Sequence, residues 1–426
     1  MIQVSMSLIL EMLGISLSIA AIVLGLGPLR KHIVDRSKLD FQRIRKYISD
    51  ERPLLTERAF EFYANRYGFE KLRIELNGME QKIHVLCPSE WIPKKPINLK
   101  NVRIVLVDST EHNKELPSLP IRYLPFQQRR LLSRFSTYSD SIYQLDKPYL
   151  FVNKDIYRLL GIKIGNEDAT FEFDSQRRNF FDHIDSESVV SYELGRFLER
   201  NPNLPNERLF KKLNYRGKLG NPLDFVLRKA SLGIDTLTLY KEQGRWKYLL
   251  LLRNEKVAEG GGYFHVVPSG EFQPAVWGRT AFDDEIINRD RDFWRNIMRE
   301  YDEEIQNSPE IDYYGEYLHI PPYEQLMSAY EKGEIKVYLL GACIDPFNLR
   351  TQMLTACIFK ENTFHKIFTN LKELDAEGKL TWKCNSFEGL EFSEDEIKKR
   401  ISSQRTLEPA KALLALAWKN KEFLEN

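Results

Sequence analysis

The sequence predicts an α/β protein in three parts: a single N-terminal transmembrane helix, a mixed α+β middle region and a C-terminal α/β/α sandwich. Three observations predict this. Residues 12–29 carry no charged side chain, residues 235–359 contain several strand-like apolar runs, and an acidic helical segment over 290–307 divides those runs into two groups. We place the parts at 1–30 (anchor), 31–59 (juxtamembrane connector), 60–228 (middle region) and 229–426 (sandwich).

The N-terminal segment has the length and polarity of a membrane span. Residues 7–29 are mainly apolar, with Glu11 as the one interruption, and at about 1.5 Å per residue a run of this kind crosses a bilayer. The basic residues follow this run, between positions 30 and 38, and basic residues stay on the cytoplasmic side. We therefore expect a single-pass protein with its bulk in the cytoplasm. A short buried core helix is the alternative.

Composition limits the function classes. With 426 residues the chain is long enough for two soluble domains, and its 62 Lys and Arg nearly balance 61 Asp and Glu. This balance gives no reason to expect nucleic acid as a partner. The four cysteines form no CxxC pair and the seven histidines no HExxH, which argues against zinc and against a disulfide framework.

The connector and the middle region combine helix-like and strand-like sequence patterns. Residues 30–58 are charged and helical in pattern, and 182–200 repeats apolar residues at helical spacing. Strand-like runs are expected at 83–87, 102–107 and 149–152. This region shows no catalytic motif, so a sensing module and a cap on the C-terminal part both stay open.

The C-terminal part is expected to hold a mixed sheet. Runs at 235–240 and 246–252 flank a short Gly-containing turn and predict a hairpin. Further expected strands are 263–267, 335–340, 353–359 and 381–384, and the closing helix is 409–423.

The acidic helix carries the strongest chemical signal. Glu300, Glu303 and Glu304 lie at positions i, i+3 and i+4, which share one helix face. Clustered carboxylate oxygens are the ligands that Mg²⁺ accepts, and Mg²⁺ then bridges to substrate phosphates. Arg299 could orient one of these carboxylates. A solvated charged helix face is the alternative.

The run from Arg299 to Ile305 resembles the second half of the Nudix box, Arg-Glu-aliphatic-x-Glu-Glu, and Pro268 to Pro274 stands where the loop before that helix would be. The resemblance implies a Nudix-like α/β/α sandwich. Four features depart from it. Arg291 stands where the family has Glu, and Tyr301 where it has an aliphatic residue. Gln306 replaces the usual Gly, and the spacing from Gly270 to Arg299 is longer.

The resemblance also implies roles for residues. Glu300, Glu303 and Glu304 would bind Mg²⁺, and Glu303 or Glu304 would act as the catalytic base on water. Glu388 in a later loop is an alternative base, although an ordinary loop carboxylate is the simpler interpretation. Three further candidates, each with a structural alternative, are the possible metal neighbour Glu271, the mid-strand His265 and the glycine run 260–262.

An anchor joined through a middle region to a divergent Nudix-like domain resembles the transmembrane-Nudix effectors of bacterial cyclic-oligonucleotide-based antiphage signalling (CBASS). The resemblance implies an inner-membrane effector that is activated by a cyclic oligonucleotide. It would hydrolyse a nucleotide diphosphate linkage, disturb the membrane, or do both, and a homo-oligomer is left open. A housekeeping nucleotide hydrolase and a catalytically silent Nudix fold that binds a regulatory ligand are the alternatives.

Overall fold

The computed structural model describes residues 38–108, 137–148, 151–175, 178–254, 261–275, 288–306, 308, 317–369, 378–380 and 389–425. Within these ranges no helix is both long enough and apolar enough to cross a membrane. The expected anchor, residues 1–30, lies outside them, as do Glu388 and the expected strand 381–384.

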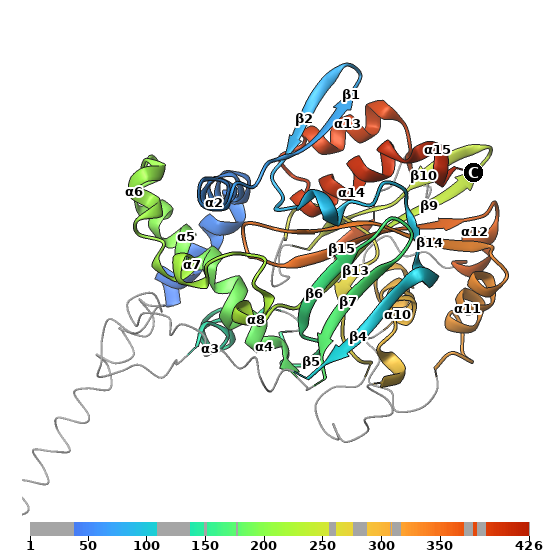
Figure 1. The fold of residues 1–426 in the computed structure, drawn as a ribbon, viewed down its shortest axis with the longest axis horizontal. Coiled ribbons are helices and arrows are strands. Elements are labelled where there is room, and N and C mark those ends of the chain that lie inside the picture. The colour runs from blue at the N-terminus through green and yellow to red at the C-terminus, as the bar shows by residue number, and fades with distance from the viewer. Residues whose placement is uncertain are drawn as a thin grey trace, which may run out of the picture.

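The C-terminal region is built from short and long strands with helices between them (Figure 1). Its strands are β9 (Leu232–Glu242), β10 (Arg245–Tyr248), β11 (Leu250–Arg253), β12 (Phe264–Val266), β13 (Ser269–Glu271), β14 (Ile335–Ile344), β15 (Thr351–Phe359), β16 (Gly378–Leu380) and β17 (Leu390–Glu391). Its helices are α10 (Phe293–Gln306), α11 (Tyr323–Glu331), α12 (Thr363–Ile367), α13 (Glu394–Ser402), α14 (Glu408–Lys419) and α15 (Lys421–Leu424).

The preceding regions combine a helical group with small sheets. The helical elements are residues 38–50, α2 (Arg52–Tyr67), α3 (Tyr138–Leu145), α4 (Phe180–His183), the π-helical turn η5 (Ile184–Ser188), α5 (Val189–Arg200), α6 (Asn206–Phe210), α7 (Asn214–Leu219) and α8 (Phe225–Arg228), with 3₁₀ turns η1 (Ser89–Trp91) and η2 (Leu99–Asn101). The strands are β1 (Leu72–Leu76), β2 (Met79–Ile83), β3 (Ile97–Asn98), β4 (Val102–Val107), β5 (Asp155–Ile156), β6 (Leu159–Ile164), β7 (Ala169–Asp174) and β8 (Arg178–Asn179).

A mixed sheet lies at the centre of the C-terminal region. Among the described residues its strand order is β17-β10-β9-β15-β14-β3, and β13 also pairs with β9. β9 and β15 run parallel, from the pair Leu232 and Thr351 to the pair Tyr240 and Phe359. Parallel neighbours need a crossover connection, and α10 and α11 lie in the connection between these two strands.

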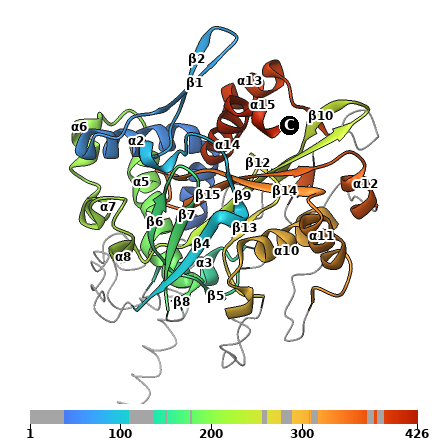
Figure 2. The same ribbon diagram turned by 45° about the vertical axis from the view of Figure 1, so that its right-hand side comes forward.

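Helices cover both faces of this sheet (Figures 1 and 2). On one face α14 packs against β9, β14 and β15, and on the other α10 packs against β13 and α11 against β14. The side chains of β15 alternate accordingly, since Leu354 and Ala356 join the core beneath α14, whereas Met353 and Cys357 join the core that contains α10. The fold is therefore mixed α/β, with a helical layer on each face of the sheet.

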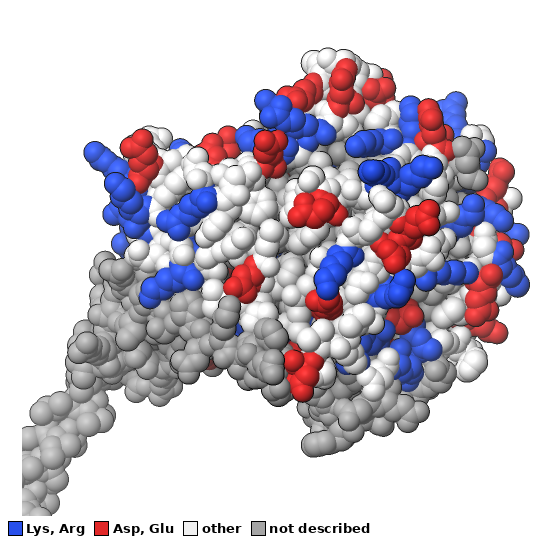
Figure 3. Space-filling view, viewed as in Figure 1, with Lys and Arg blue, Asp and Glu red and all other residues white. Residues whose placement is uncertain are grey.

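The middle region packs directly on the C-terminal region. Phe171 and Phe173 of β7 contact Phe293 in α10 and Phe272 after β13, with ring centroids 5.4 and 5.1 Å apart respectively. Both regions contribute to one hydrophobic core, and β3 pairs with β14 at the edge of the central sheet. On the face in Figure 3 acidic and basic side chains are interspersed, which agrees with the near-zero net charge.

Several expected elements are confirmed. The strand 102–107 is β4, the strand 263–267 contains β12, and the helix 182–200 lies within the continuous run from α4 to α5. The hairpin of β9 and β10 turns through Gln243 and Gly244, both with positive φ, as a two-residue hairpin turn of this kind requires.

Other expected elements are wrong in detail. The run 83–87 is not one strand, because Leu86 forms an isolated bridge to Ile344 while the His84 amide donates to Glu408. The expected strand 246–252 is broken at Leu249, so that β10 joins the central sheet and β11 a separate sheet with β12 and β16. The closing helix is interrupted at Asn420, between α14 and α15. Residues 151 and 152 are not in a strand.

Candidate functional site

Helix α10 is fixed by its apolar face. Ile297, Met298, Tyr301 and Ile305 are buried in the core that it shares with the sheet. The Tyr301 hydroxyl also lies 2.8 Å from the Thr238 hydroxyl of β9. The aromatic residue at the position where the Nudix box has an aliphatic one therefore adds a polar anchor to the helix.

The structure brings two of the three predicted glutamates to strand β13. Glu304 is 2% exposed, and its carboxylate accepts a 2.8 Å hydrogen bond from the Ser269 amide. Glu300 lies against the next residue, because a Cβ on Gly270 would stand 2.0 Å from the Glu300 carboxyl carbon. In this arrangement only glycine leaves space for that carboxylate, so Gly270 permits Glu300 to approach the strand whose Ser269 amide binds Glu304.

The third glutamate is placed differently. Glu303 is half-buried, and its charge acts to raise the pKa of Arg299 and the pKa of Tyr323. Among the described residues no group of three or more His, Cys, Asp and Glu side chains is arranged to hold a metal ion. Mg²⁺ usually takes one or two carboxylates and completes its shell with water and substrate phosphates. The pair Glu300 and Glu304 is compatible with that smaller requirement.

Arg299 holds the segment after β13 against the helix. Its guanidinium donates to the backbone carbonyl of Gln273 and, at 2.9 Å, to the side-chain oxygen of Asn296. Burial acts to lower the Arg299 pKa, but the pKa is nonetheless raised, because the side chains of Tyr317, Asp290, Glu303 and Glu300 favour the charged form. The carboxylates thus act on Arg299 through space, while its hydrogen bonds go to Gln273 and Asn296.

Arg291, at the position that the resemblance compares with the first glutamate of the Nudix box, lies against the middle region. Its guanidinium carbon lies 5.1 Å from the ring centroid of Tyr157, and it donates a 2.7 Å hydrogen bond to Asn288. Tyr157 in turn packs against Phe272, with ring centroids 4.7 Å apart. This position therefore serves packing between regions.

The weaker candidates have structural roles. Glu271 is 7% exposed and forms a 2.7 Å ion pair with Arg350. His265 is 4% exposed, and its Nε2 lies 3.1 Å from an Asp235 oxygen. Gly261 and Gly262 form a turn, and Gly260 lies outside the described residues.

Sequence reasoning missed a cluster of buried arginines around the turn that joins β14 to β15. The Arg52 guanidinium forms a 2.8 Å ion pair with Asp345, and Arg216 donates to the carbonyls of Pro346 and Phe347 at 2.6 and 2.8 Å. Arg228 donates to the Leu349 carbonyl at 2.6 Å. Three cations from the regions before residue 229 thus hold one turn of the C-terminal sheet.

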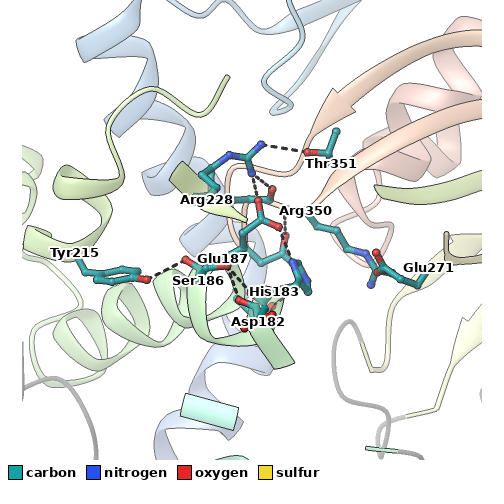
Figure 4. A network of polar contacts seen from close by, with 12 residues as sticks. Asp182, His183, Ser186, Glu187, Tyr215, Arg228, Glu271, Arg350 and Thr351 are labelled. Carbon is teal, nitrogen blue, oxygen red and sulfur yellow. Dashed lines mark hydrogen bonds and ion pairs between the residues drawn. The ribbon is translucent and has the colours of Figure 1, made fainter. Parts of the chain in front are cut away.

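Arg228 belongs to a wider network, which Figure 4 shows. Glu187 of η5 accepts hydrogen bonds from Arg228 and, at 2.6 Å, from His183, and each of these three side chains is at most 1% exposed. Burial acts to lower the His183 pKa, but the hydrogen bond and charge of Glu187 raise it above its ordinary value. η5 is a π-helical turn, a distortion found frequently at functional sites.

The turn between β14 and β15 also reaches the candidate site. Arg350 is its last residue, and its partner Glu271 follows Gly270 directly on β13. Arg52, Arg216 and Arg228 are 121 to 293 residues from their partners in this turn, so no local pattern could reveal these contacts. The signal in the sequence was a break between two apolar strands, where Asp345, Pro346 and Asn348 favour a turn.

Comparisons with known proteins add no family assignment. No protein-family model matches the chain. No curated protein matches it either.

Proposed function

We propose that the chain is a membrane-anchored, Mg²⁺-dependent hydrolase of Nudix type that acts on a nucleotide diphosphate linkage. The observation that carries the proposal is the placement of Glu300 and Glu304 against the backbone of β13 by a helix that packs on a mixed sheet. The resemblance of residues 299–305 to the Nudix box supplies the reaction class.

In this proposal Glu300, Glu303 and Glu304 would hold the metal, and Glu303 or Glu304 would accept a proton from the attacking water. Bound Mg²⁺ supplies charge neutralisation on the diphosphate and lowers the pKa of water. The Ser269 amide keeps the Glu304 carboxylate oriented through the hydrogen bond that it donates to this carboxylate. Arg299 holds Gln273 close to the helix, so the segment after β13 keeps its position.

The biological role that we propose is that of an antiphage effector of the CBASS type at the inner membrane, switched on by a cyclic oligonucleotide. The apolar run over residues 7–29 supports the membrane part of this proposal. Deleting residues 1–29 should release the protein from the membrane fraction on centrifugation. A deletion variant that still pellets with membranes would refute the single-span anchor.

A second candidate function is a catalytically silent fold that binds a regulatory ligand. It is favoured by Arg291, whose side chain lies over Tyr157 where the family has a glutamate, and by the 2% exposure of Glu304. In that case the glutamates would stabilise the packing of α10 on β13 without binding metal.

The deciding experiment measures Mg²⁺-dependent hydrolysis by the full chain in detergent. The substrates are dinucleotides, nucleotide sugars and triphosphates, each with and without cyclic oligonucleotides. Glu300→Gln and Glu303→Gln should each lower turnover by about 10²-fold or more, as losses of groups that stabilise transition-state charge do. Glu207→Gln, in the exposed part of α6, is the matched control and should keep full activity. Absence of turnover in every condition would refute the hydrolase and favour the silent fold.

A further inference from the structure

A cavity of about 770 Å³ lies at some distance in sequence from the glutamates, between helical residues 38–50, α3, η5 with α5, and the segments at 261–263 and 404–405. Its volume falls within the range of pockets that hold small ligands, about 300–1,000 Å³. No step of the proposed hydrolysis uses it.

The charged side chains in the walls of this cavity are predominantly basic. Its described lining residues include Arg45, Lys46, Arg52 and Arg405, against a single carboxylate, Asp50. Clefts lined by charges of one sign concentrate ligands of the opposite sign. The overall charge of the chain is +1, so the excess of cations is a local feature of the cavity.

The cations differ in how far they are already neutralised. Arg45 pairs with Asp146 at 3.2 Å and Arg52 with Asp345 at 2.8 Å, and neither of these carboxylates lines the cavity. Lys46 pairs with Asp50 at 3.0 Å, but both side chains are more than half exposed, and such pairs contribute little. Among the described residues Arg405 forms no ion pair with a carboxylate, and it is exposed and lines the cavity.

Aromatic side chains complete the lining. Tyr138, Phe151, Tyr263 and Phe347 contribute to the walls. The Tyr263 hydroxyl donates a 2.8 Å hydrogen bond to the Ser49 carbonyl, which fixes its ring beside the helix. Guanidinium groups bind phosphate oxygens, and aromatic rings stack with flat heterocycles. A nucleotide combines both of these chemical groups.

We propose that this cavity is a nucleotide-binding site, with the phosphates held by Arg405, Arg45 and Lys46 and a base packed against the aromatic wall. The site does not depend on the proposed hydrolysis. It is distinct from the glutamates of α10, and its nucleotide is a ligand that the chain binds without needing to cleave it.

The contacts around the cavity also provide a route to the glutamates. Arg52 lines the cavity and pairs with Asp345, and the Arg52 guanidinium lies 4.4 Å from the ring centroid of Phe347, which lines it too. Asp345 and Phe347 belong to the turn between β14 and β15. The last residue of that turn, Arg350, pairs with Glu271 on β13. A nucleotide that competes with Asp345 for Arg52 would alter this turn, and through it the strand that carries Gly270.

The effect of this coupling on catalysis rests on the proposed function, whereas the nucleotide-binding site itself is independent of it. The two parts therefore need separate measurements, both on the full chain in detergent.

The first measurement is calorimetric titration with ADP and with cyclic di-AMP, using adenosine as the phosphate-free control. At least one phosphate-bearing probe should bind below about 1 mM, and adenosine should not. Arg405→Gln should weaken binding about tenfold or more, as the loss of a charge-assisted hydrogen bond does. Arg73→Gln, an exposed arginine paired with Glu80 on β1 and β2, is the matched control. Failure of both probes to bind, or equal binding by Arg405→Gln, would overturn the proposal.

The second measurement is hydrogen exchange of peptides that cover 263–275 and 340–353, with and without the bound probe. Binding should change protection in both peptides. Arg350→Gln leaves the cavity lining intact and should keep binding while removing the change at 263–275. An unchanged response in that variant would refute the coupling. Binding and coupling without hydrolysis of any substrate would refute the proposed hydrolase and leave the nucleotide site standing.

Discussion

Replacing Arg228 with methionine tests whether the buried arginines hold the regions together. Arg228 is fully buried, and it donates to Glu187, to the Leu349 carbonyl and to Thr351. Methionine has a comparable length and no charge. The substitution removes every one of these hydrogen bonds and leaves Glu187 buried with His183 as its remaining charged partner.

The expected loss of stability follows from this arrangement. Removing one partner of a buried ion pair costs about 3–5 kcal/mol, because the other charge stays buried with less compensation, and Glu187 would keep only His183. Unfolding entropy is about 2.1 cal/mol/K per residue, so the melting temperature of a cooperative 426-residue chain changes by roughly 1 °C per kcal/mol. Arg228→Met should therefore lower Tm by roughly 3–5 °C, measured by tryptophan fluorescence in detergent.

A second variant separates the ion pair from packing. Glu187→Gln in addition to Arg228→Met removes the buried carboxylate that has lost its arginine, so the double variant should recover part of the lost stability. Arg103→Met, at an exposed ion pair with Asp168, is the control and should leave Tm within about 1 °C, since such pairs contribute little. A loss for Arg228→Met no larger than this control would refute the role we assign to the network.

Three further predictions concern separate features. The raised His183 pKa contributes stability that is fully present below the ordinary histidine value of 6.5 and is lost as pH rises through the folded-state pKa; His183→Gln should therefore show a smaller fall in Tm than wild type between about pH 6 and 8. Gly270→Ala should displace the Glu300 carboxylate and reduce hydrolysis while Tm changes little. Gly161→Ala, whose new Cβ would also meet a glutamate carboxylate, is the control and should keep activity. Equal activity in the two variants would contradict the placement of Glu300. Tyr301→Phe should cost about 0.5–1.5 kcal/mol of unfolding free energy by denaturant titration, the usual value of one buried hydrogen bond, and no loss would show that the contact with Thr238 is not stabilising.

The sequence was most informative where local pattern and burial agree. The strand expected at 353–359, the hairpin turn at Gln243 and Gly244, and the spacing of the α10 glutamates follow from an apolar run, turn chemistry and helical periodicity, and the structure contains these elements. The approach of Glu300 to β13 could be anticipated only in part, since it needs Gly270 opposite the helix.

The rest depended on contacts between residues distant in sequence. The strand expected at 246–252 breaks at Leu249, and nothing in the apolar sequence marks this break. The break arises because β10 and β11 join different sheets. The run at 83–87 looks like a strand, but its backbone groups are used by Glu408 and Ile344. In the sequence, the arginines that bind the β14–β15 turn cannot be distinguished from exposed charged residues, and only the fold shows that they are buried.

The turn between β14 and β15 has a consequence for synthesis of the chain. Arg52 and Asp345 are 293 residues apart. At about 5–20 residues per second, the ribosome makes the arginine roughly 15–60 s before its carboxylate. During that interval the helices near the N-terminus exist without the turn that neutralises and covers their buried cations. Nascent chains stalled before residue 345 should therefore be sensitive to protease and dependent on chaperones, and chains stalled well after β15 should be protected.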